Sequence, residues 1–438
     1  MRIALISEHA SPLATLGGTD SGGQNVYVME VARALASRGH RVDVFTRRDS
    51  PQLSPAVELL PGVRVLHIDA GPAAAVPKEA LLPHMPAFGE AAEALCRSGA
   101  PYDVVHANFF MSALVGLRLK ARLALPLVVT FHALGLVRRE HQGAADGFPP
   151  EREAIERRTV QEADRIVAEC PQDEADLVRL YGADPAHLAL VPCGVDTREF
   201  APGSKACARR ALGLADGEFI VLQLGRMVPR KGVDNVIRAL ALMAPARRPA
   251  RLVVVGGNSA TPDEAATPEL GRLREVARAC GVQARVTFTG QREHAALCTW
   301  YRAADVFVST PWYEPFGITP LEAMACGRPV IGSDVGGIRY SVLHGECGFL
   351  VPPHDPAALA RRLDQLQASP ALAAALGRGG VRRVRARFTW QQVADQLAGV
   401  YAEVAGPRRQ PRCLPQRSAA GPGAGSAAGS APPVLLPA

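Results

Sequence analysis

The sequence predicts an α/β protein built from two doubly wound parallel sheets in tandem. Short apolar runs with β-branched residues alternate with amphipathic helical stretches, which is the pattern of βαβ units. The pattern restarts after a polar joint at residues 192–196, and 438 residues exceed the usual size of one hydrophobic core. Two such sheets imply a cleft. Because ligands bind outside the carboxyl ends of parallel strands, the functional residues should lie in the loops that follow strands.

The first predicted domain covers residues 1–195. Its first helix is expected over residues 24–37, where apolar residues recur at helical spacing, and Gly39 suits the end of that helix. The strands predicted in this domain are residues 3–6, 42–46, 63–67, 103–106, 127–131, 165–167 and 188–191.

The second predicted domain covers residues 196–388. Its predicted strands are residues 220–224, 252–255, 286–288, 306–309 and 330–332, and helical patterns dominate from Pro356. A last amphipathic helix is predicted over residues 389–404, with Thr389 as its N-cap. Residues 406–438 are rich in Pro, Gly, Ala, Ser and Arg, so we predict a disordered tail.

Composition narrows the classes of function. A hydrophobic content of 48% with 21% charged residues is typical of a globular protein. The formal charge is +7, but part of it comes from the tail arginines Arg408, Arg409, Arg412 and Arg417. The remaining mild excess suits a small phosphate-bearing substrate and lacks the dense basic stripe of a nucleic-acid binder. We therefore expect no nucleic-acid partner, and nothing in the sequence indicates an oligomeric state.

The nine cysteines are scattered, with no C-x-x-C pair and no histidine cluster at zinc spacing. They predict neither disulfides nor a structural metal, which suits a reducing cytoplasm. The apolar run at residues 3–6 is too short for a signal peptide, and no segment approaches a membrane span. We expect a cytoplasmic protein without a cofactor or metal site.

Two acids, Glu314 and Glu322, lie where the strand at residues 306–309 turns into a helix predicted over residues 319–326. A helix start offers backbone N–H groups to an anion, and carboxylates accept hydrogen bonds from vicinal sugar hydroxyls. A lone pair of acids at this spacing is as typical of a helix cap and a surface charge. The intervening Phe316 and Gly317 favour the ligand interpretation.

Two cations, Arg226 and Lys231, occupy the loop after the strand at residues 220–224. A basic turn alone is usually solvated surface, but this one follows a strand and shares its sheet edge with the two acids. Together the cations predict a diphosphate site that would neutralise a leaving group without a metal ion.

The opposite side of the cleft carries weaker signals. A glycine-rich loop at residues 16–25 matches neither a Walker A sequence nor a dinucleotide fingerprint. A flexible turn is its simpler interpretation, but Gly23 would let backbone N–H groups approach a ligand, and Asp20 and Asn25 are candidates for hydrogen bonds to a polyol. His132 ends the strand at residues 127–131 and should point into the cleft, although a structural role is commoner for a single histidine.

In combination, these motifs resemble the signature of the family 4 retaining glycosyltransferases, up to about Val404. The stretches at residues 7–13 and 22–28 look closest to the branch containing sucrose-phosphate synthase, sucrose synthase and D-inositol-3-phosphate glycosyltransferase. The resemblance implies the GT-B fold, two Rossmann-like domains facing across a cleft, with the helix at residues 389–404 packing back on the first domain. It also implies transfer of a hexosyl group from a nucleotide-sugar, expected to be a UDP-sugar, to a small acceptor with retention of configuration.

The resemblance also implies roles for single residues. His132 and Glu314 would act at the transferred sugar, Glu314 together with the backbone of Phe316 and Gly317. The other implied donor contacts are Arg226, Lys231 and Gly23 to the diphosphate, and Glu322 to the ribose. In this family the acceptor attacks on the leaving-group face and the donor phosphate takes its proton, so no protein nucleophile is implied.

For the acceptor, Lys78 and Arg152 fall where the inositol-phosphate enzymes bind a phosphate, which favours a phosphorylated acceptor. Where those enzymes place a Tyr and a Thr, this chain carries Phe109 and Ala133, which cannot donate the same hydrogen bonds. Fructose 6-phosphate or fructose therefore stays open as the acceptor. A peripheral-membrane or polysaccharide transferase with the same donor site, and a non-catalytic sugar-nucleotide-binding regulator, are the alternatives.

Overall fold

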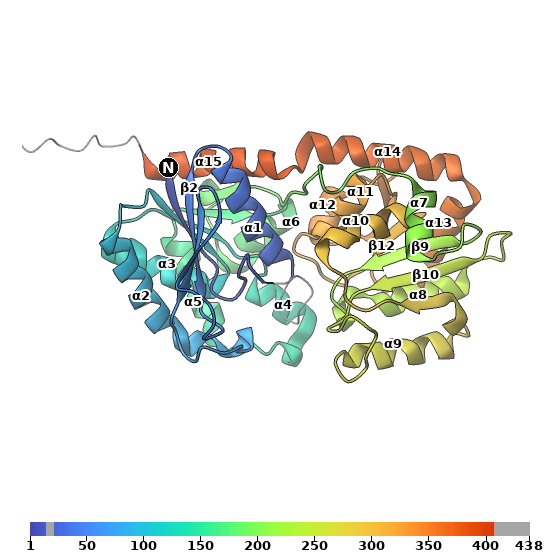
Figure 1. The fold of residues 1–438 in the computed structure, drawn as a ribbon, viewed down its shortest axis with the longest axis horizontal. Helices are drawn as coiled ribbons and strands as arrows, with labels where there is room; N and C mark the ends of the chain where they lie inside the picture. The colour runs from blue at the N-terminus through green and yellow to red at the C-terminus, as the bar shows by residue number, and fades with distance from the viewer. Residues whose placement is uncertain (15–21, 407–438) are drawn as a thin grey trace, which may run out of the picture. The chain divides into compact units, whose positions relative to one another are not determined.

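The computed structural model describes residues 1–14 and 22–406. The predicted tail at residues 407–438 and the candidate Asp20 lie outside this part of the chain. Residues Met1–Ala405 form one compact unit that contains two β-sheets (Figure 1). The predicted class, two parallel-sheet α/β halves, is confirmed. The division into domains at residues 195 and 196 stays a prediction.

The first sheet has the strand order β3-β4-β2-β1-β5-β6-β7-β8. All its neighbours are parallel except β3 and β4. The chain leaves β1 toward β2 and returns to the other side of β1 with β5, so the sheet reverses its winding between β1 and β5. The strands are β1 (Arg2–Ile6), β2 (Arg41–Arg47), β3 (Ala56–Leu60), β4 (Val63–Ile68), β5 (Val104–Asn108), β6 (Leu127–Thr130), β7 (Arg165–Ala168) and β8 (Leu188–Leu190).

Helices cover both faces of this sheet, which explains the continuous apolar runs of its strands. In β1, Ile3 and Leu5 pack in one core with α1 and α15, whereas Ala4 and Ile6 pack in another with α2 and α3. Figure 1 shows α1 and α2 on opposite sides of β2. The helices of this half are α1 (Gly23–Ala36), α2 (Met85–Ser98), α3 (Phe110–Leu123), α4 (Gly135–Gln142), α5 (Glu151–Glu162) and α6 (Pro171–Tyr181).

The second sheet is entirely parallel, with the order β11-β10-β9-β12-β13-β14. Its winding reverses between β9 and β12, which are neighbours. The strands are β9 (Phe219–Leu224), β10 (Ala250–Val255), β11 (Val286–Phe288), β12 (Val306–Ser309), β13 (Val330–Ser333) and β14 (Gly348–Val351). The helices are α7 (Lys205–Leu212), α8 (Val233–Leu242), α9 (Pro268–Ala279), α10 (His294–Ala303), α11 (Ile318–Ala325), α12 (Gly336–Ser341), α13 (Pro356–Ala368) and α14 (Pro370–Arg387).

Two strands were not predicted. The edge strand β3 has no buried residue, so it lacks the apolar run that marks the other strands. The strand β14 has only four residues, Gly348–Val351, and such a short apolar run does not by itself separate a strand from a helix.

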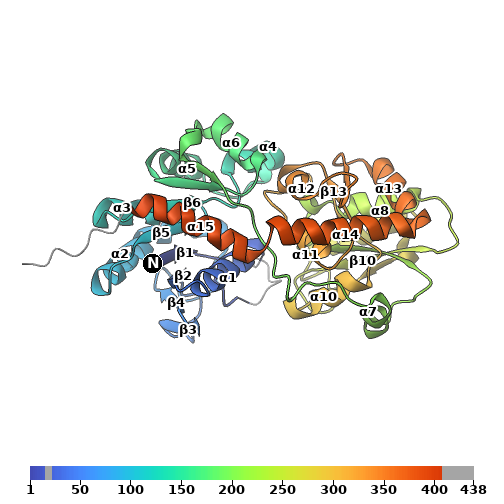
Figure 2. The same cartoon turned by 90° about the horizontal axis from the view of Figure 1, so that it is seen from above.

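The last helix, α15 (Trp390–Ala405), contacts α1 and β5 of the first half, and Figure 2 shows it above β5. Its start has a capping box: the Gln392 N–H donates to Thr389 Oγ1 over 3.3 Å, and the Thr389 N–H donates to Gln392 Oε1 over 3.1 Å. Val195 bridges to Thr389, so the chain passes twice between the halves at one place. Gly194 fits there because a Cβ would lie 2.8 Å from the Trp390 ring.

Candidate active site

A cavity of about 310 Å³ lies at the carboxyl ends of the strands, with walls from both sheets and from the start of α1. Its lining contains residues that follow β5, β6 and β7 of the first sheet and β9, β10 and β12 of the second. Both points of reversed winding therefore contribute to one site, as expected for doubly wound sheets. The sequence-predicted residues on this wall are Gly23, Asn25, Lys78, His132, Arg226, Lys231, Glu314, Phe316, Gly317 and Glu322.

The loops after β9 and β12 bring Lys231 and Glu314 together in an ion pair between Nζ and Oε2. Arg230 adds its Nη1 at 3.5 Å from the same carboxylate oxygen and donates to the Tyr313 carbonyl over 3.1 Å. Gly232 is required behind this pair, because its φ is +65° and a Cβ would lie 2.0 Å from the Thr310 carbonyl oxygen. The pair is therefore fixed by the backbone at the reversal between β9 and β12.

The charges of this pair depend on each other. Burial raises the pKa of Glu314, but the charges of Lys231 and Arg230 outweigh it and hold that pKa below its usual value. Burial lowers the pKa of Lys231 to about 8, although Glu314 acts in the opposite direction. A second anion near this loop would further stabilise the charged lysine.

Glu322 lies on α11, 4% exposed, and accepts a hydrogen bond of 2.7 Å from the Tyr301 hydroxyl. His294, at the start of α10, places Nε2 3.8 Å from Glu322 and Nδ1 3.0 Å from Glu199. Burial alone lowers the pKa of His294, but its two acidic partners raise it to about 10, so the ring carries a positive charge at neutral pH. Sequence reasoning missed His294, although it lies soon after β11 at the same sheet edge.

His132 follows β6 with its backbone in the left-handed region, at a φ of +58°. Its Nδ1 lies 3.1 Å from Glu169 Oε1, and its Nε2 lies 3.0 Å from Asn108 Oδ1. Its ring also meets Tyr27 edge to face, with centroids 4.7 Å apart. Both nitrogens of the imidazole, which was predicted to bond a sugar hydroxyl, are thus bonded to protein side chains that fix the orientation of the ring.

Glu169 and Asn108 were not predicted as site residues. Asn108 ends β5 and Glu169 directly follows β7, so both occupy the sheet edge that was expected to carry the site. Burial raises the pKa of Glu169, but His132 outweighs burial and holds it below its usual value. The pattern that could have identified them is a polar residue at the end of each of three neighbouring strands.

The predicted acceptor ligands are placed differently from one another. Lys78 lines the cavity at the start of a 3-10 turn, Lys78–Ala80. Asn25 lines it as well, but its Oδ1 accepts from the Gly22 N–H over 2.9 Å and its Nδ2 donates to the Ser11 carbonyl over 3.0 Å. Gly22 lies beside Arg226, because a Cβ on it would be 3.7 Å from Arg226 Nε. The start of α1 thus adjoins the basic loop of the second sheet.

Arg152 does not line the cavity and is 1% exposed. Its Nε donates to Glu156 over 2.7 Å, and Nη2 donates to the Ala133 carbonyl. The guanidinium carbon lies about 5 Å from three ring centroids, those of Phe109, Phe110 and Phe148. The structure therefore places Arg152 behind the wall, while Phe109 and Phe148 form part of the wall itself.

Phe109 carries a second unusual backbone conformation, with a φ of +87°. Like His132 it follows a strand of the first sheet and faces the cavity. A left-handed conformation is uncommon for residues other than glycine and costs roughly 1–3 kcal/mol, so it persists where the surroundings enforce it. Such strain is concentrated at functional sites, which supports this wall as part of one.

Among the described residues, no group of three or more His, Cys, Asp or Glu side chains is arranged to hold a metal ion. Among the same residues, no helix is long and apolar enough to cross a membrane. The expectation that no metal or cofactor takes part stays a prediction.

Two protein-family models match the chain, one in each half. The model described as Glycosyltransferase Family 4 covers residues 21–199, and that described as Glycosyl transferases group 1 covers residues 204–383. D-inositol 3-phosphate glycosyltransferase 2 of Catenulispora acidiphila is 38% identical over 410 residues, 92% of this chain and 94% of that protein. The D-inositol 3-phosphate glycosyltransferase of Acidothermus cellulolyticus is 41% identical over 416 residues, 93% of this chain and 91% of that protein.

Among solved structures, the sucrose-phosphate synthase of Thermosynechococcus elongatus superposes with a TM-score of 0.84 at 36% identity. The match covers 92% of this chain and 98% of that chain. Fold and site thus define a glycosyltransferase of the GT-B class. More narrowly, the chain belongs to family 4 of the glycosyltransferases, which confirms the resemblance found in the sequence.

Proposed function

We propose that this enzyme transfers a hexosyl group, with retention of configuration, from a UDP-sugar to D-inositol 3-phosphate or a similar phosphorylated polyol. The observation that carries the proposal is the single cavity that joins the Lys231–Glu314 pair to His132 and Lys78. The 38–41% identity to D-inositol 3-phosphate glycosyltransferases over most of the chain supports this acceptor class. A cytoplasmic location is part of the proposal.

On the donor side, the proposal assigns the diphosphate to the basic loop after β9. Arg226, Arg230 and Lys231 all line the cavity there, at the reversal of the second sheet. A diphosphate would compete with Glu314 for Lys231 and free that carboxylate to accept hydrogen bonds from the sugar. Glu322 would hold the ribose, and the cations would neutralise the leaving diphosphate without a metal ion.

In the proposed reaction the acceptor oxygen attacks the anomeric carbon on the face that the diphosphate leaves. One C–O bond forms to the acceptor, the bond from the anomeric carbon to the phosphate oxygen breaks, and the acceptor proton passes to a donor phosphate oxygen. His132, held by Glu169 and Asn108, would line the sugar site as a fixed polar surface. No covalent intermediate with the protein is needed.

On the acceptor side, Lys78 and Arg138 line the cavity together with Phe109 and Phe148. Lys78 supplies a charge for a phosphate. Arg138 is held by Asp146 over 2.9 Å, and its guanidinium carbon lies 5.0 Å from the Phe148 ring centroid. This combination suits a phosphorylated ring compound, with the cations on the phosphate and the apolar side chains against the carbon skeleton.

Fructose 6-phosphate is the second candidate acceptor. The likeness to sucrose-phosphate synthase at 36% identity favours it, as do Phe109 and Ala133, which cannot supply two hydroxyl ligands predicted for an inositol phosphate.

The test is release of free nucleotide from UDP-, GDP- and ADP-sugars in EDTA, with D-inositol 3-phosphate, fructose 6-phosphate or neither. We expect turnover with one UDP-sugar that rises at least about tenfold with D-inositol 3-phosphate. A rise with fructose 6-phosphate alone would replace the proposed acceptor with the second candidate. Failure to bind or turn over any nucleotide-sugar would overturn the proposal as a whole.

A double variant distinguishes further between the two candidate acceptors. Phe109→Tyr with Ala133→Thr restores two hydroxyl groups on the cavity wall, and each hydrogen bond to a charged phosphate is worth about 1.5–3 kcal/mol. We expect the KM for D-inositol 3-phosphate to fall by a factor of about 100 or more if both bonds form, with the KM for the donor unchanged. Leu136→Met, on α4 outside the cavity lining, is the control, and an equal fall there would contradict the reasoning.

A further inference from the structure

A second cavity, of about 330 Å³, lies at the opposite edge of the second sheet. Its lining includes Phe219, the first residue of β9, Asp305, just before β12, and Arg328, just before β13. The strands are parallel, so these residues mark the amino ends, whereas Lys231 and Glu314 follow the carboxyl ends. The two cavities share no lining residue.

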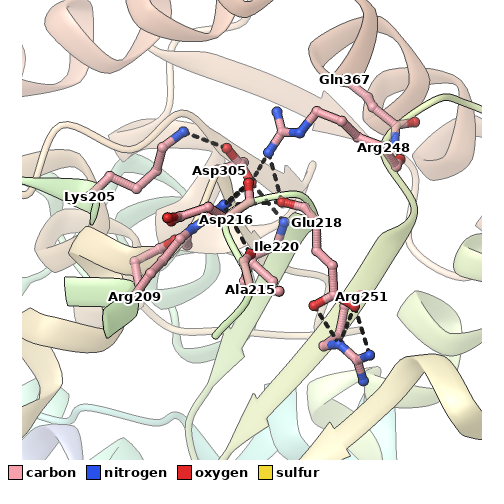
Figure 3. Close-up of polar contacts among 12 residues, drawn as sticks. Lys205, Arg209, Ala215, Asp216, Glu218, Ile220, Arg248, Arg251, Asp305 and Gln367 are labelled. Carbon is pink, nitrogen blue, oxygen red and sulfur yellow. Dashed lines mark hydrogen bonds and ion pairs between the residues drawn. The ribbon is translucent and has the colours of Figure 1, made fainter. Parts of the chain in front are cut away.

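Asp305 is the centre of the polar contacts at this edge. Figure 3 shows Lys205, Arg209 and Arg248 converging on its carboxylate. Lys205 Nζ lies at 2.7 Å, Arg209 Nη2 at 2.5 Å and Arg248 Nη2 at 3.3 Å, and the Ile220 N–H donates over 2.8 Å. Burial raises the pKa of Asp305, but the hydrogen bonds from Lys205 and Ile220 outweigh it. One carboxylate thus faces three cations.

Two of these cations, Arg209 and Arg248, differ in burial and in their contacts. Arg209 is 2% exposed and also donates to the carbonyls of Ala303 and Asp216, each over 3.0 Å, so it holds α7 against the sheet. Arg248 Nη2 donates to the Glu218 carbonyl over 2.7 Å, but about a third of its side chain is exposed, and it lines the cavity. Arg248 is therefore able to contact a ligand while Arg209 is structural.

The cavity lining has more positive than negative charge. Lys205, Arg248, Arg328 and Arg378 line it, with Asp305 as its acid. Arg328 donates to the Ala304 carbonyl over 3.1 Å, a neutral acceptor, and burial lowers the pKa of its guanidinium. Within the described part of the chain the structure gives Arg378, exposed on α14, no ion pair. An excess of positive charge in a cavity is unfavourable, and a bound anion would compensate it.

We propose that this cavity binds a small phosphomonoester as a site separate from catalysis. Guanidinium groups match the oxygen geometry of phosphate, and a phosphate dianion offsets more of the excess charge than a carboxylate would. The lining also includes the apolar side chains of Phe219, Pro202 and Leu366, which can pack against the carbon part of the ester. Its volume is in the range of small-molecule sites.

The site also adjoins an element of the donor site. Helix α11 carries Glu322 on the wall of the first cavity, and Gly327 and Arg328, just beyond its end, line the second. Glu322 lies three residues before the end of α11 at Ala325, which is about 5 Å of helix at 1.5 Å per residue. A ligand bound at Arg328 would thus lie just beyond the end of the helix that carries Glu322, the proposed ribose contact.

The test is isothermal titration of the full chain with glycerol 3-phosphate and, separately, with inorganic phosphate. The same titration of Lys231→Ala excludes binding at the basic loop after β9. We expect saturable binding of glycerol 3-phosphate in both proteins, and tighter than that of inorganic phosphate. Arg378→Ala and Arg248→Gln should each weaken it about tenfold or more, the effect of losing a hydrogen bond to a charged group.

Arg385→Ala is the matched control, because Arg385 is an exposed arginine on α14 outside the lining of this cavity. It should change the affinity less than twofold, since its charge is screened from the site by solvent. Equal weakening in Arg385→Ala, loss of binding in Lys231→Ala, or unchanged binding in both Arg378→Ala and Arg248→Gln would each overturn the proposal. So would the absence of saturable binding, or preference for inorganic phosphate over the ester.

Discussion

The two sheet edges that form the first cavity hold their polar side chains by different means. At the second sheet, Lys231 and Glu314 form an ion pair on a backbone that requires Gly232. At the first sheet, His132 is held by neighbouring side chains, and its own backbone takes the left-handed conformation without glycine. The second edge is therefore organised by charge and by a backbone turn that requires glycine, and the first by hydrogen bonds between side chains of neighbouring strands.

Because of this difference, we expect substitutions at the two edges to reduce activity by different amounts. A charge that faces a leaving diphosphate acts on the transition state directly, whereas a residue that orients a histidine acts through it. Three predictions follow the ranking from the largest effect to the smallest.

Lys231→Ala removes the cation of the basic loop after β9 that pairs with Glu314. We expect kcat/KM to fall about 100- to 1000-fold, the usual effect of losing one donor to developing charge. Steady-state nucleotide release measures it. Lys120→Ala, which breaks an ion pair with Asp164 at the surface, is the control and should change the rate less than twofold. A loss below tenfold in Lys231→Ala would contradict the donor assignment.

Glu169→Gln keeps the shape of the side chain that orients His132 and removes its charge. We expect kcat to fall about tenfold with the donor KM unchanged, because Glu169 loses the charge that strengthens its hydrogen bond with His132. Asp173→Asn is the control: its carboxylate accepts from the Glu169 N–H over 3.1 Å, and burial raises its pKa to about 7. An equal fall of kcat in Asp173→Asn would show that Glu169 is merely structural.

The charge on His294 makes the thermal stability of the protein depend on pH. Glu199 and Glu322 outweigh the effect of burial and raise the pKa of His294 in the folded protein to about 10, above its ordinary value of 6.5. The stability contributed by the charged ring is fully present below pH 6.5 and is lost as pH rises through 10. We expect the Tm to fall more steeply between pH 7 and 10 in the unaltered protein than in His294→Gln. Parallel Tm curves would refute the assignment.

The same contrast explains what could be predicted from the sequence. Lys231, Glu314 and Glu322 were found because each follows a strand in a local motif, and the structure brings them to one cavity. Asn108 and Glu169 belong to no motif, since they meet His132 only when β5, β6 and β7 are side by side. Arg152 matched a family position, but two of the aromatic rings that cover it, Phe109 and Phe110, come from another part of the chain.

The fold was predicted by the same kind of signal. Strands such as β1 are buried on both faces and therefore appear as apolar runs, whereas β3 is an exposed edge and was missed. The capping residue Thr389 was predicted from its position at the start of the last amphipathic stretch, and its partner Gln392 is only three residues away. The contact of the last helix with β5 needed the whole topology and was available only through the family resemblance.

The return of α15 to the first sheet affects the order of events during synthesis. His106, inside the first sheet, bonds to the hydroxyl of Tyr401 over 2.7 Å, and Tyr27 packs against Trp390 with ring centroids 5.8 Å apart. A nascent chain still attached to the ribosome at residue 389 has completed the first sheet but lacks these partners. The amino-terminal half therefore reaches its final packing only after the carboxy-terminal half has been translated.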